Sequence, residues 1–144
     1  MTHKIVVGFD GSASGRAALD FAVRVARAQG GSIVIAHVLE WSPYSFLTPN
    51  EIEERHKRRK EELARARTAV LDPVVAELAE SGVETSTALK YGHIAETLCK
   101  IASDEGAGQI VIGRTGHSTL SARLFGSVAG SLAQAAPVPV TIVP

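Results

Sequence analysis

Apolar residues follow two alternating patterns along the chain. Short runs are apolar almost throughout, as in Ile5-Val6-Val7 and Ile110-Val111-Ile112. Continuous apolarity of this kind is typical of parallel strands that are covered on both faces. It predicts strands over residues 4–9, 32–39, 84–90, 109–113 and 138–143. Stretches with helical spacing lie between them and predict helices over residues 13–29, about 49–80, 93–104 and 127–136.

The second predicted helix carries its own start and break signals. Thr48 supplies a hydroxyl cap, Pro49 suits the first helical position, and Glu51 lies three residues after the cap. Pro73 has no N–H, and its ring clashes with the preceding helical turn. We therefore expect Pro73 to kink or divide this helix.

The alternation of strands and helices predicts an α/β fold that forms one domain over residues 1–144. The expected architecture is a doubly wound, open sheet of five parallel strands with right-handed crossovers. Ligands of such sheets bind beyond the carboxyl ends of the strands, at the point where the strand order reverses. The loops after the first and fourth strands are therefore the first places to look for a site.

Composition narrows the class of function. Lys plus Arg and Asp plus Glu each total 15, so no overall charge draws the chain to nucleic acid or an anionic membrane. No apolar run approaches the ~20 residues that span a bilayer, and with no targeting segment evident we expect a cytoplasmic protein. Cys99 is the one cysteine, which excludes an internal disulfide, and its helical surroundings predict a structural thiol.

The loop after the fourth strand has the composition of an anion-binding segment. It reads Gly113-Arg114-Thr115-Gly116, then nine residues, then Gly126-Ser127-Val128. Glycines let backbone N–H groups approach a ligand, and a helix start adds free donors and a positive dipole end. The alternative is that these glycines form only a turn and a helix cap. If the loop binds a nucleotide, valine at Gly113 or Gly126 should remove binding and leave the fold intact.

The loop after the first strand offers an acid. It reads Gly8-Phe9-Asp10-Gly11-Ser12. Asp10 could meet a ribose hydroxyl, a base edge or a phosphate-bound metal. It could equally form a turn or cap with Gly11 and Ser12 before the first helix, and the sequence leaves both interpretations open.

The spacing Gly113-x2-Gly116-x9-Gly126-Ser127 resembles the nucleotide-binding signature of the ATP-binding branch of the universal stress protein family. The resemblance covers the whole chain. It includes Ile5-Val6-Val7-Gly8-Phe9-Asp10-Gly11-Ser12, Ile35-Ala36-His37-Val38 and Pro137-Val138-Pro139-Val140. It implies an adenine-nucleotide alpha hydrolase-like fold with strand order 3-2-1-4-5.

The resemblance also implies a ligand and its site. The ligand would be ATP, or ADP or AMP, with Mg²⁺ or Mn²⁺ bridging the phosphates. By position, Gly8, Asp10 and Val38 would form the adenine and ribose side, and Ile112 would pack against the nucleotide. Those expected around the ribose and phosphates are Gly113, Gly116, Gly126, Ser127 and Val128; their neighbours Phe9, Gly11, Ser12 and Arg114 complete the candidate site. After Val128 the family pattern has a hydroxyl and then an acidic residue, where this chain has Ala129-Gly130.

The function implied is regulatory. Bound nucleotide would change conformation, dimerisation or contacts with a protein partner, and a homodimer is expected through the last strand. The alternatives are a slow ATPase, for which no catalytic base is evident, and a nucleotide-free structural or adaptor dimer. No catalytic residue and no metal ligand are assigned.

Other residues that could suggest function have simpler explanations or stay open. His37 in an apolar strand is expected to be a satisfied structural histidine. Basic residues 55–60 are flanked by glutamates, with Glu54–Arg58 among the favourable i,i+4 pairs, which predicts a solvated helix face and not a nucleic-acid site. The aromatic residues of segment 41–47 could form a lid over adenine, pack on the sheet or contact a partner; they are Trp41, Tyr44 and Phe46.

Overall fold

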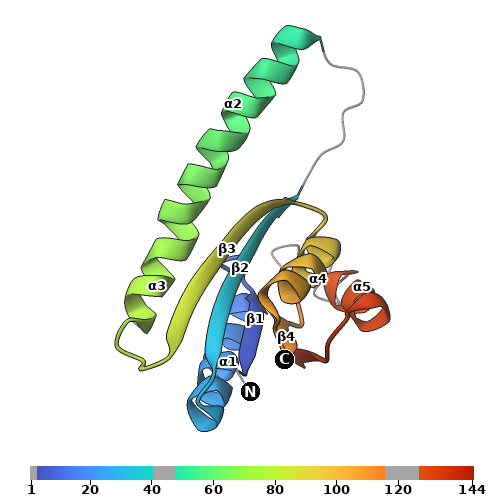
Figure 1. The fold of residues 1–144 in the computed structure, drawn as a ribbon. Coiled ribbons are helices and arrows are strands. Elements are labelled where there is room, and N and C mark those ends of the chain that lie inside the picture. The colour runs from blue at the N-terminus through green and yellow to red at the C-terminus, as the bar shows by residue number, and fades with distance from the viewer. Residues whose placement is uncertain (1–2, 41–47, 116–126) are drawn as a thin grey trace.

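Five parallel strands form one sheet in the order β3-β2-β1-β4-β5 (Figure 1). The order expected from the sequence is therefore confirmed. The computed structural model describes residues 3–40, 48–115 and 127–144, and the structural statements below concern these residues. The strands are β1 (Lys4–Gly8), β2 (Ser32–Glu40), β3 (Glu84–Gly92), β4 (Gln109–Gly113) and β5 (Val140–Val143).

Helices cover both faces of the sheet, as a doubly wound fold requires. One face carries α1 (Ala13–Gln29) and α3 (Asp72–Leu78), and the other carries α4 (Ile94–Glu105) and α5 (Ser127–Ala135). The longest helix, α2 (Pro49–Ala66), joins α3 through the π-helical turn η1 (Arg67–Leu71). In Figure 1 these three segments follow one continuous path, and α2 extends past the carboxyl ends of β2 and β3.

The core lies in two layers because the central strands alternate their side chains between faces. Val7 packs in the cluster that contains Leu19 of α1, whereas its neighbour Val6 packs in the cluster that contains Leu98 of α4. Val6 and Val7 are both fully buried. This double burial is the physical reason for the continuous apolar pattern of the strands.

The predicted helix caps are present. The Thr48 hydroxyl accepts the N–H of Glu51 at 3.2 Å, and the Glu51 carboxylate accepts the N–H of Thr48 at 3.2 Å. Ser12 caps α1, its hydroxyl accepting the N–H of Gly15 at 3.0 Å. Gly30 ends α1 in the left-handed region at φ 70°, a conformation that favours glycine.

Pro73 divides the long helix, as expected. The division is a wider, π-helical turn, and the helix axis continues across it. Because proline has no N–H, the carbonyl four residues before it cannot receive the usual helical bond. The chain takes up an extra residue in this turn, and the N–H of Asp72 bonds the carbonyl of Arg67. The result is the π-turn η1.

The ends of some elements differ from the prediction. The last strand begins at Val140 and not at residue 138, because Pro139 has no N–H and joins the sheet only by accepting the Ile110 N–H at 2.9 Å. The helical segment predicted to reach residue 80 ends at Leu78, whose carbonyl accepts the Ser81 hydroxyl at 2.6 Å.

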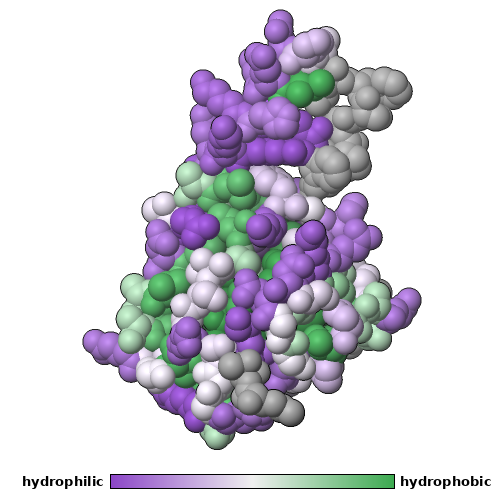
Figure 2. Space-filling model, in the orientation of Figure 1, coloured by the Kyte–Doolittle hydropathy of each residue, from purple (hydrophilic) through white to green (hydrophobic). Residues whose placement is uncertain are grey.

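The outer part of α2 is a solvated helix face, as predicted. Ala66 is the one buried residue of α2, and Figure 2 shows hydrophilic residues over nearly all of the projecting part. Glu54 and Arg58 form the expected pair at 4.0 Å with both side chains largely exposed. None of the helices in the described part of the chain is both long and apolar enough to cross a bilayer.

Candidate functional site

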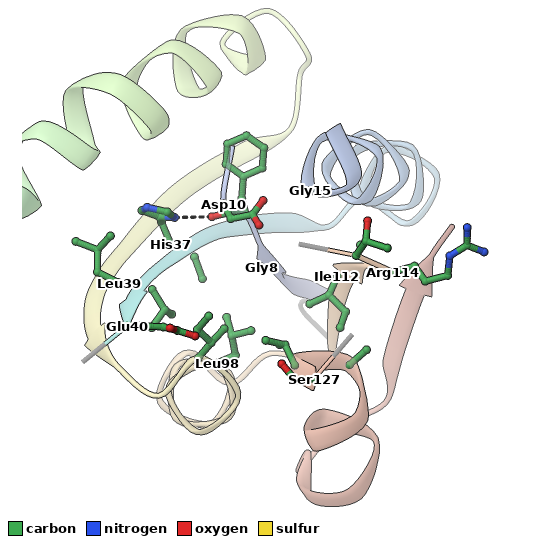
Figure 3. Close-up of a pocket in the computed structure, with 18 of the residues that line it drawn as sticks. Gly8, Asp10, Gly15, His37, Leu39, Glu40, Leu98, Ile112, Arg114 and Ser127 are labelled. Carbon is green, nitrogen blue, oxygen red and sulfur yellow. Dashed lines mark hydrogen bonds between the residues drawn. The ribbon is translucent and has the colours of Figure 1, made fainter. Parts of the chain in front are cut away.

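A cavity of about 570 Å³ opens at the carboxyl edge of the sheet. Small-molecule sites commonly measure roughly 300–1,000 Å³. Its walls come from the ends of β1, β2 and β4, the first turns of α1, α4 and α5, and η1 (Figure 3). The cavity therefore lies where β1 and β4 meet and the strand order reverses, as the topology predicted.

The floor of the cavity is apolar and tightly closed. Gly8 lines it, and a Cβ at this position would lie 3.0 Å from the Ile112 Cγ2 atom and 3.2 Å from the Leu98 Cδ1 atom. Glycine here lets Ile112 and Leu98 meet over the end of β1. Val38 adds a third apolar side chain from the end of β2.

Asp10 forms the turn that the sequence analysis gave as one interpretation, and its contact with a ligand stays a prediction. Its Oδ1 atom accepts the N–H of Ser12 at 2.9 Å and also the Ser12 hydroxyl, so Asp10 stabilises the turn into α1. Asp10 also lines the cavity, and Figure 3 shows it between His37 and Gly15. Gly11 permits the turn, at φ 81°. Gly11 and Ser12 themselves do not line the cavity and serve the turn instead.

His37 is held as a structural histidine, in agreement with the sequence analysis. The residue is 8% exposed, and Nδ1 lies 2.7 Å from the carbonyl oxygen of Phe9 (Figure 3). Because a carbonyl only accepts, Nδ1 carries the proton. The Phe9 N–H in turn bonds the carbonyl of Ala36 at 2.8 Å, which fixes the end of β1 against β2. Phe9 and His37 both line the cavity.

Gly113 lines the cavity, but its missing side chain is explained by packing. A Cβ at Gly113 would contact the Ser14 hydroxyl and would lie 2.5 Å from the Ser14 carbonyl oxygen. The same Ser14 hydroxyl accepts the N–H of Thr115 at 3.1 Å. The first turn of α1 is thus pressed against the loop that leaves β4. The expectation that valine at Gly113 leaves the fold intact does not hold in this geometry, since the Ser14 backbone would have to move.

The start of α5 supplies the polar end of the cavity. Ser127 and Val128 lie in its first turn and line the cavity, and the first N–H groups of a helix, which have no partner within the helix, favour an anion together with the positive end of its dipole. Arg114 also lines the rim, but Figure 3 shows its side chain extending away from the space between Asp10 and Ser127. Arg114 donates its backbone N–H to the carbonyl of Val143 at 2.9 Å.

Nine of the thirteen predicted site residues line this cavity. These are Gly8, Phe9, Asp10, Val38, Ile112, Gly113, Arg114, Ser127 and Val128. Gly116 and Gly126 lie outside the described residues, as do Trp41, Tyr44 and Phe46.

Sequence reasoning missed several lining residues. Leu39 and Glu40 continue β2 directly after Val38, so their position at a strand end could have indicated them. Val70 comes from η1 in the middle of a crossover helix, and no sequence signal marks it.

The described wall of the cavity carries few ionisable groups. Two carboxylates, Asp10 and Glu40, line its described part. The described residues contain no group of three or more His, Cys, Asp or Glu side chains that could hold a metal ion. Cys99 lies in α4 outside the cavity wall, partly buried against the second core cluster, and desolvation by burial raises the pKa of its thiol.

Comparison with known proteins places this geometry in a family. A model of the universal stress protein family matches residues 1–144. The chain belongs to the universal stress protein family. The universal stress protein YxiE of Bacillus subtilis is 30% identical over 156 aligned residues, which cover 99% of both chains.

Solved universal stress protein structures share the fold. UspA from Lactobacillus plantarum superposes with a TM-score of 0.84 at 25% identity, covering 99% of this chain and 97% of that one. A universal stress protein in complex with cAMP superposes with a TM-score of 0.64 at 25% identity, covering 99% of this chain and 97% of that one.

Proposed function

We propose that this protein binds an adenine nucleotide in the cavity at the carboxyl edge of its sheet, and that the bound nucleotide regulates its contacts. The observation that carries the proposal is the polarity of the cavity. Val38, Leu98 and Ile112 form apolar walls, and the first turn of α5 forms a polar end. A nucleotide has the same two parts, a flat base of low polarity and an anionic phosphate group.

This polarity gives the ligand an orientation. The base would lie toward the ends of β1 and β2, and the phosphates toward Ser127, where helical N–H groups compensate negative charge. Asp10 follows the end of β1, lines the cavity and suits a ribose hydroxyl, because a carboxylate accepts hydrogen bonds. The relative in complex with cAMP supports an adenine ligand for this fold.

A divalent cation is part of the proposal. Mg²⁺ prefers oxygen ligands and is commonly held by substrate phosphates with one or two carboxylates. Asp10 is a carboxylate of the described cavity wall and fits that role, although Ser12 already bonds its Oδ1 atom; Glu40 lies at the end of β2, on the base side. A cation there would offset the phosphate charge of ATP.

The regulatory role fits the residues around the cavity better than hydrolysis does. A base must accept a proton from water. His37, whose lone pair lies on Nε2 because Nδ1 donates to the Phe9 carbonyl, is buried at 8% exposure, and Oδ1 of Asp10 is engaged by Ser12. A nucleotide regulates by binding one conformation or assembly more tightly than another.

A homodimer through β5 completes the proposal. β5 is an edge strand, hydrogen-bonded on one side to β4, and no other described strand pairs with its second side. Its four residues are apolar or β-branched and only half-buried. Such an edge is a ready template for pairing with another strand, and a second copy of this chain offers the same edge.

The test begins with freshly purified protein. The protein is denatured, and released small molecules are identified by mass spectrometry. The stripped protein is then titrated with ATP, ADP, AMP and cAMP, with and without Mg²⁺, and each mixture is assayed for product. Co-purified nucleotide, or saturable binding without turnover, is the expected result. Steady release of ADP would show that the protein is a slow ATPase and not a regulatory binder. No binding under any condition would leave a nucleotide-free adaptor as the remaining function.

A further inference from the structure

One wall of the cavity comes from η1, which lies in the middle of the crossover helix and not at the end of a strand or the start of a helix. Val70 lies in η1, within the long crossover helix, and lines the cavity together with strand ends and helix starts. Its side chain is half-buried and packs against the first core cluster. A Cβ at Gly11 would lie 3.8 Å from Val70 Cγ1, so Val70 stands beside the turn that follows Asp10.

The π-turn explains why Val70 reaches the cavity. A π-turn contains an extra residue, so the side chains before and after it cannot keep the same helical register. Leu71 is fully buried in the core, and its neighbour Val70 is left at the boundary between core and cavity. Pro73 favours the extra residue. It has no N–H, so it cannot donate the α-helical hydrogen bond to the carbonyl four residues before it.

Val70 lies on the base side of the proposed site. It packs with the cluster formed by α1, α3 and Phe9, whereas the apolar walls Val38, Leu98 and Ile112 pack with the cluster on the opposite face of the sheet, so a base placed against those walls lies between them and Val70. Phe9 and Leu39, which line the same cavity, are also apolar. An apolar side chain that lines the cavity with other apolar residues suits a base and not a phosphate.

We propose that Val70 contacts the base of the bound ligand directly, and that the π-turn imposed by Pro73 sets the width of the cavity there. The inference rests on the proposed nucleotide function and extends it to a residue that determines specificity. It assigns a ligand role to the crossover helix, which also forms the projecting α2.

A matched pair of variants tests the contact. Val70 and Val75 are both half-buried valines packed on the same core cluster, but Val75 does not line the cavity. Val70→Ala should lower the affinities for AMP and for adenosine by the same factor, about threefold to tenfold, because the methyl groups removed would no longer cover the base. Val75→Ala should lose similar thermal stability and keep wild-type affinity. Titration calorimetry of both variants with both ligands measures this.

Two further measurements test whether Val70 and the π-turn set the width of the cavity. AMP with a benzyl group on its exocyclic amine should bind Val70→Ala more tightly than wild type, because the truncated side chain leaves room. Pro73→Ala keeps Val70 but restores the missing N–H, so AMP affinity should fall as in Val70→Ala. Wild-type affinity for AMP and adenosine in folded Val70→Ala, or equal losses in Val75→Ala, would overturn the inference.

Failure of the proposed function gives a different result. If wild type binds neither AMP nor adenosine, the nucleotide proposal fails, and the apolar dye anilinonaphthalene sulfonate becomes the probe of the cavity. Val70→Ala should then change dye affinity and Val75→Ala should not. Identical dye binding in both variants would overturn the inference as well.

Discussion

Single residues at this site carry more than one constraint, and Gly113 is the clearest case. A glycine after a strand can serve a ligand that approaches the backbone or a neighbouring element that packs closely. The sequence pattern cannot separate the two, because both require only the absence of a Cβ. The structure gives the packing partner, Ser14 of α1. Asp10 shows the same overlap, since one carboxylate both stabilises the turn to Ser12 and lines the cavity.

Alanine at Gly113 should destabilise the fold. The new Cβ would lie 2.5 Å from the Ser14 carbonyl oxygen, so backbone must shift, and overpacking of this kind costs about 1–3 kcal/mol. Gly108→Ala is the control, because a Cβ there has Lys4 carbonyl oxygen as its nearest neighbour at 3.9 Å. Urea denaturation of both variants measures the difference. Equal free energies of unfolding would contradict the packing explanation.

Aspartate at Ser127 should distinguish binding of the phosphate from binding of the base. A negative charge in the first turn favours the helix dipole of α5, so the fold should keep its stability. The same charge would repel a phosphate, and AMP affinity should fall by about threefold to tenfold at low salt, with adenosine affinity unchanged. Ser131→Asp places the same charge one turn further along. Calorimetric titration showing equal losses for both variants would place the phosphates elsewhere.

Elements differ in how far local sequence determines them. The start of α2 followed from Thr48, Pro49 and Glu51 because a capping box is local chemistry. The break at Pro73 was also predicted, since a missing N–H is a property of one residue. That the break would be a π-turn with Val70 at the cavity was not predictable, because it depends on how the core holds Leu71. The position of Val70 at the cavity therefore depends on core packing, which local sequence signals do not predict.

The contact between α2 and β3 should be sensitive to alkaline pH. Desolvation by burial and the hydrogen bond from Tyr91 to Glu62 raise the Tyr91 pKa from 10.0 to about 12. Arg59 lies over the same ring, with its guanidinium carbon 5.3 Å from the ring centre. Because the folded pKa is the higher one, this stabilisation is present below pH 10 and is lost as pH rises toward 12.

Ultraviolet titration of tyrosinate measures this shift. The chain has two tyrosines, and one should ionise near pH 12 in wild type and be absent from Tyr91→Phe. Unfolding measured across the same pH window should show a steeper loss of stability in wild type than in Tyr91→Phe. A Tyr91 that ionises near its ordinary value would show that the contact with Glu62 does not persist in solution.

At the scale of the whole molecule, the strand pattern and the family resemblance together predicted the sheet and its order. Parallel strands buried on both faces have a distinctive apolar sequence, and right-handed crossovers leave few topologies. The topology then placed Asp10 and Ile112 at one edge. The assembly of two chains was predicted only from the resemblance, since an open edge such as β5 does not specify what covers it.

Proline at Val140 should weaken the proposed dimer. The carbonyls of Pro139 and Val143 accept from β4, so the backbone groups of the alternate residues Val140 and Ile142 point to the open edge. Val140→Pro removes an outward N–H and should raise the dimer dissociation constant by at least about tenfold. Val140→Thr keeps that N–H and serves as the control. Sedimentation equilibrium that gives a monomeric wild type would instead remove β5 as the dimer interface.

The cavity is assembled from segments spread over the whole chain. Phe9, Val38, Val70, Leu98 and Val128 belong to five different parts of the sequence, and only the complete fold brings them together. A ligand held there binds native molecules and not unfolded ones, and at a hundred times its dissociation constant it adds about 2.7 kcal/mol to stability. Under the proposed function, the supply of nucleotide in the cell would then set how long each copy survives chaperones and proteases. Abundance itself would report the nucleotide level.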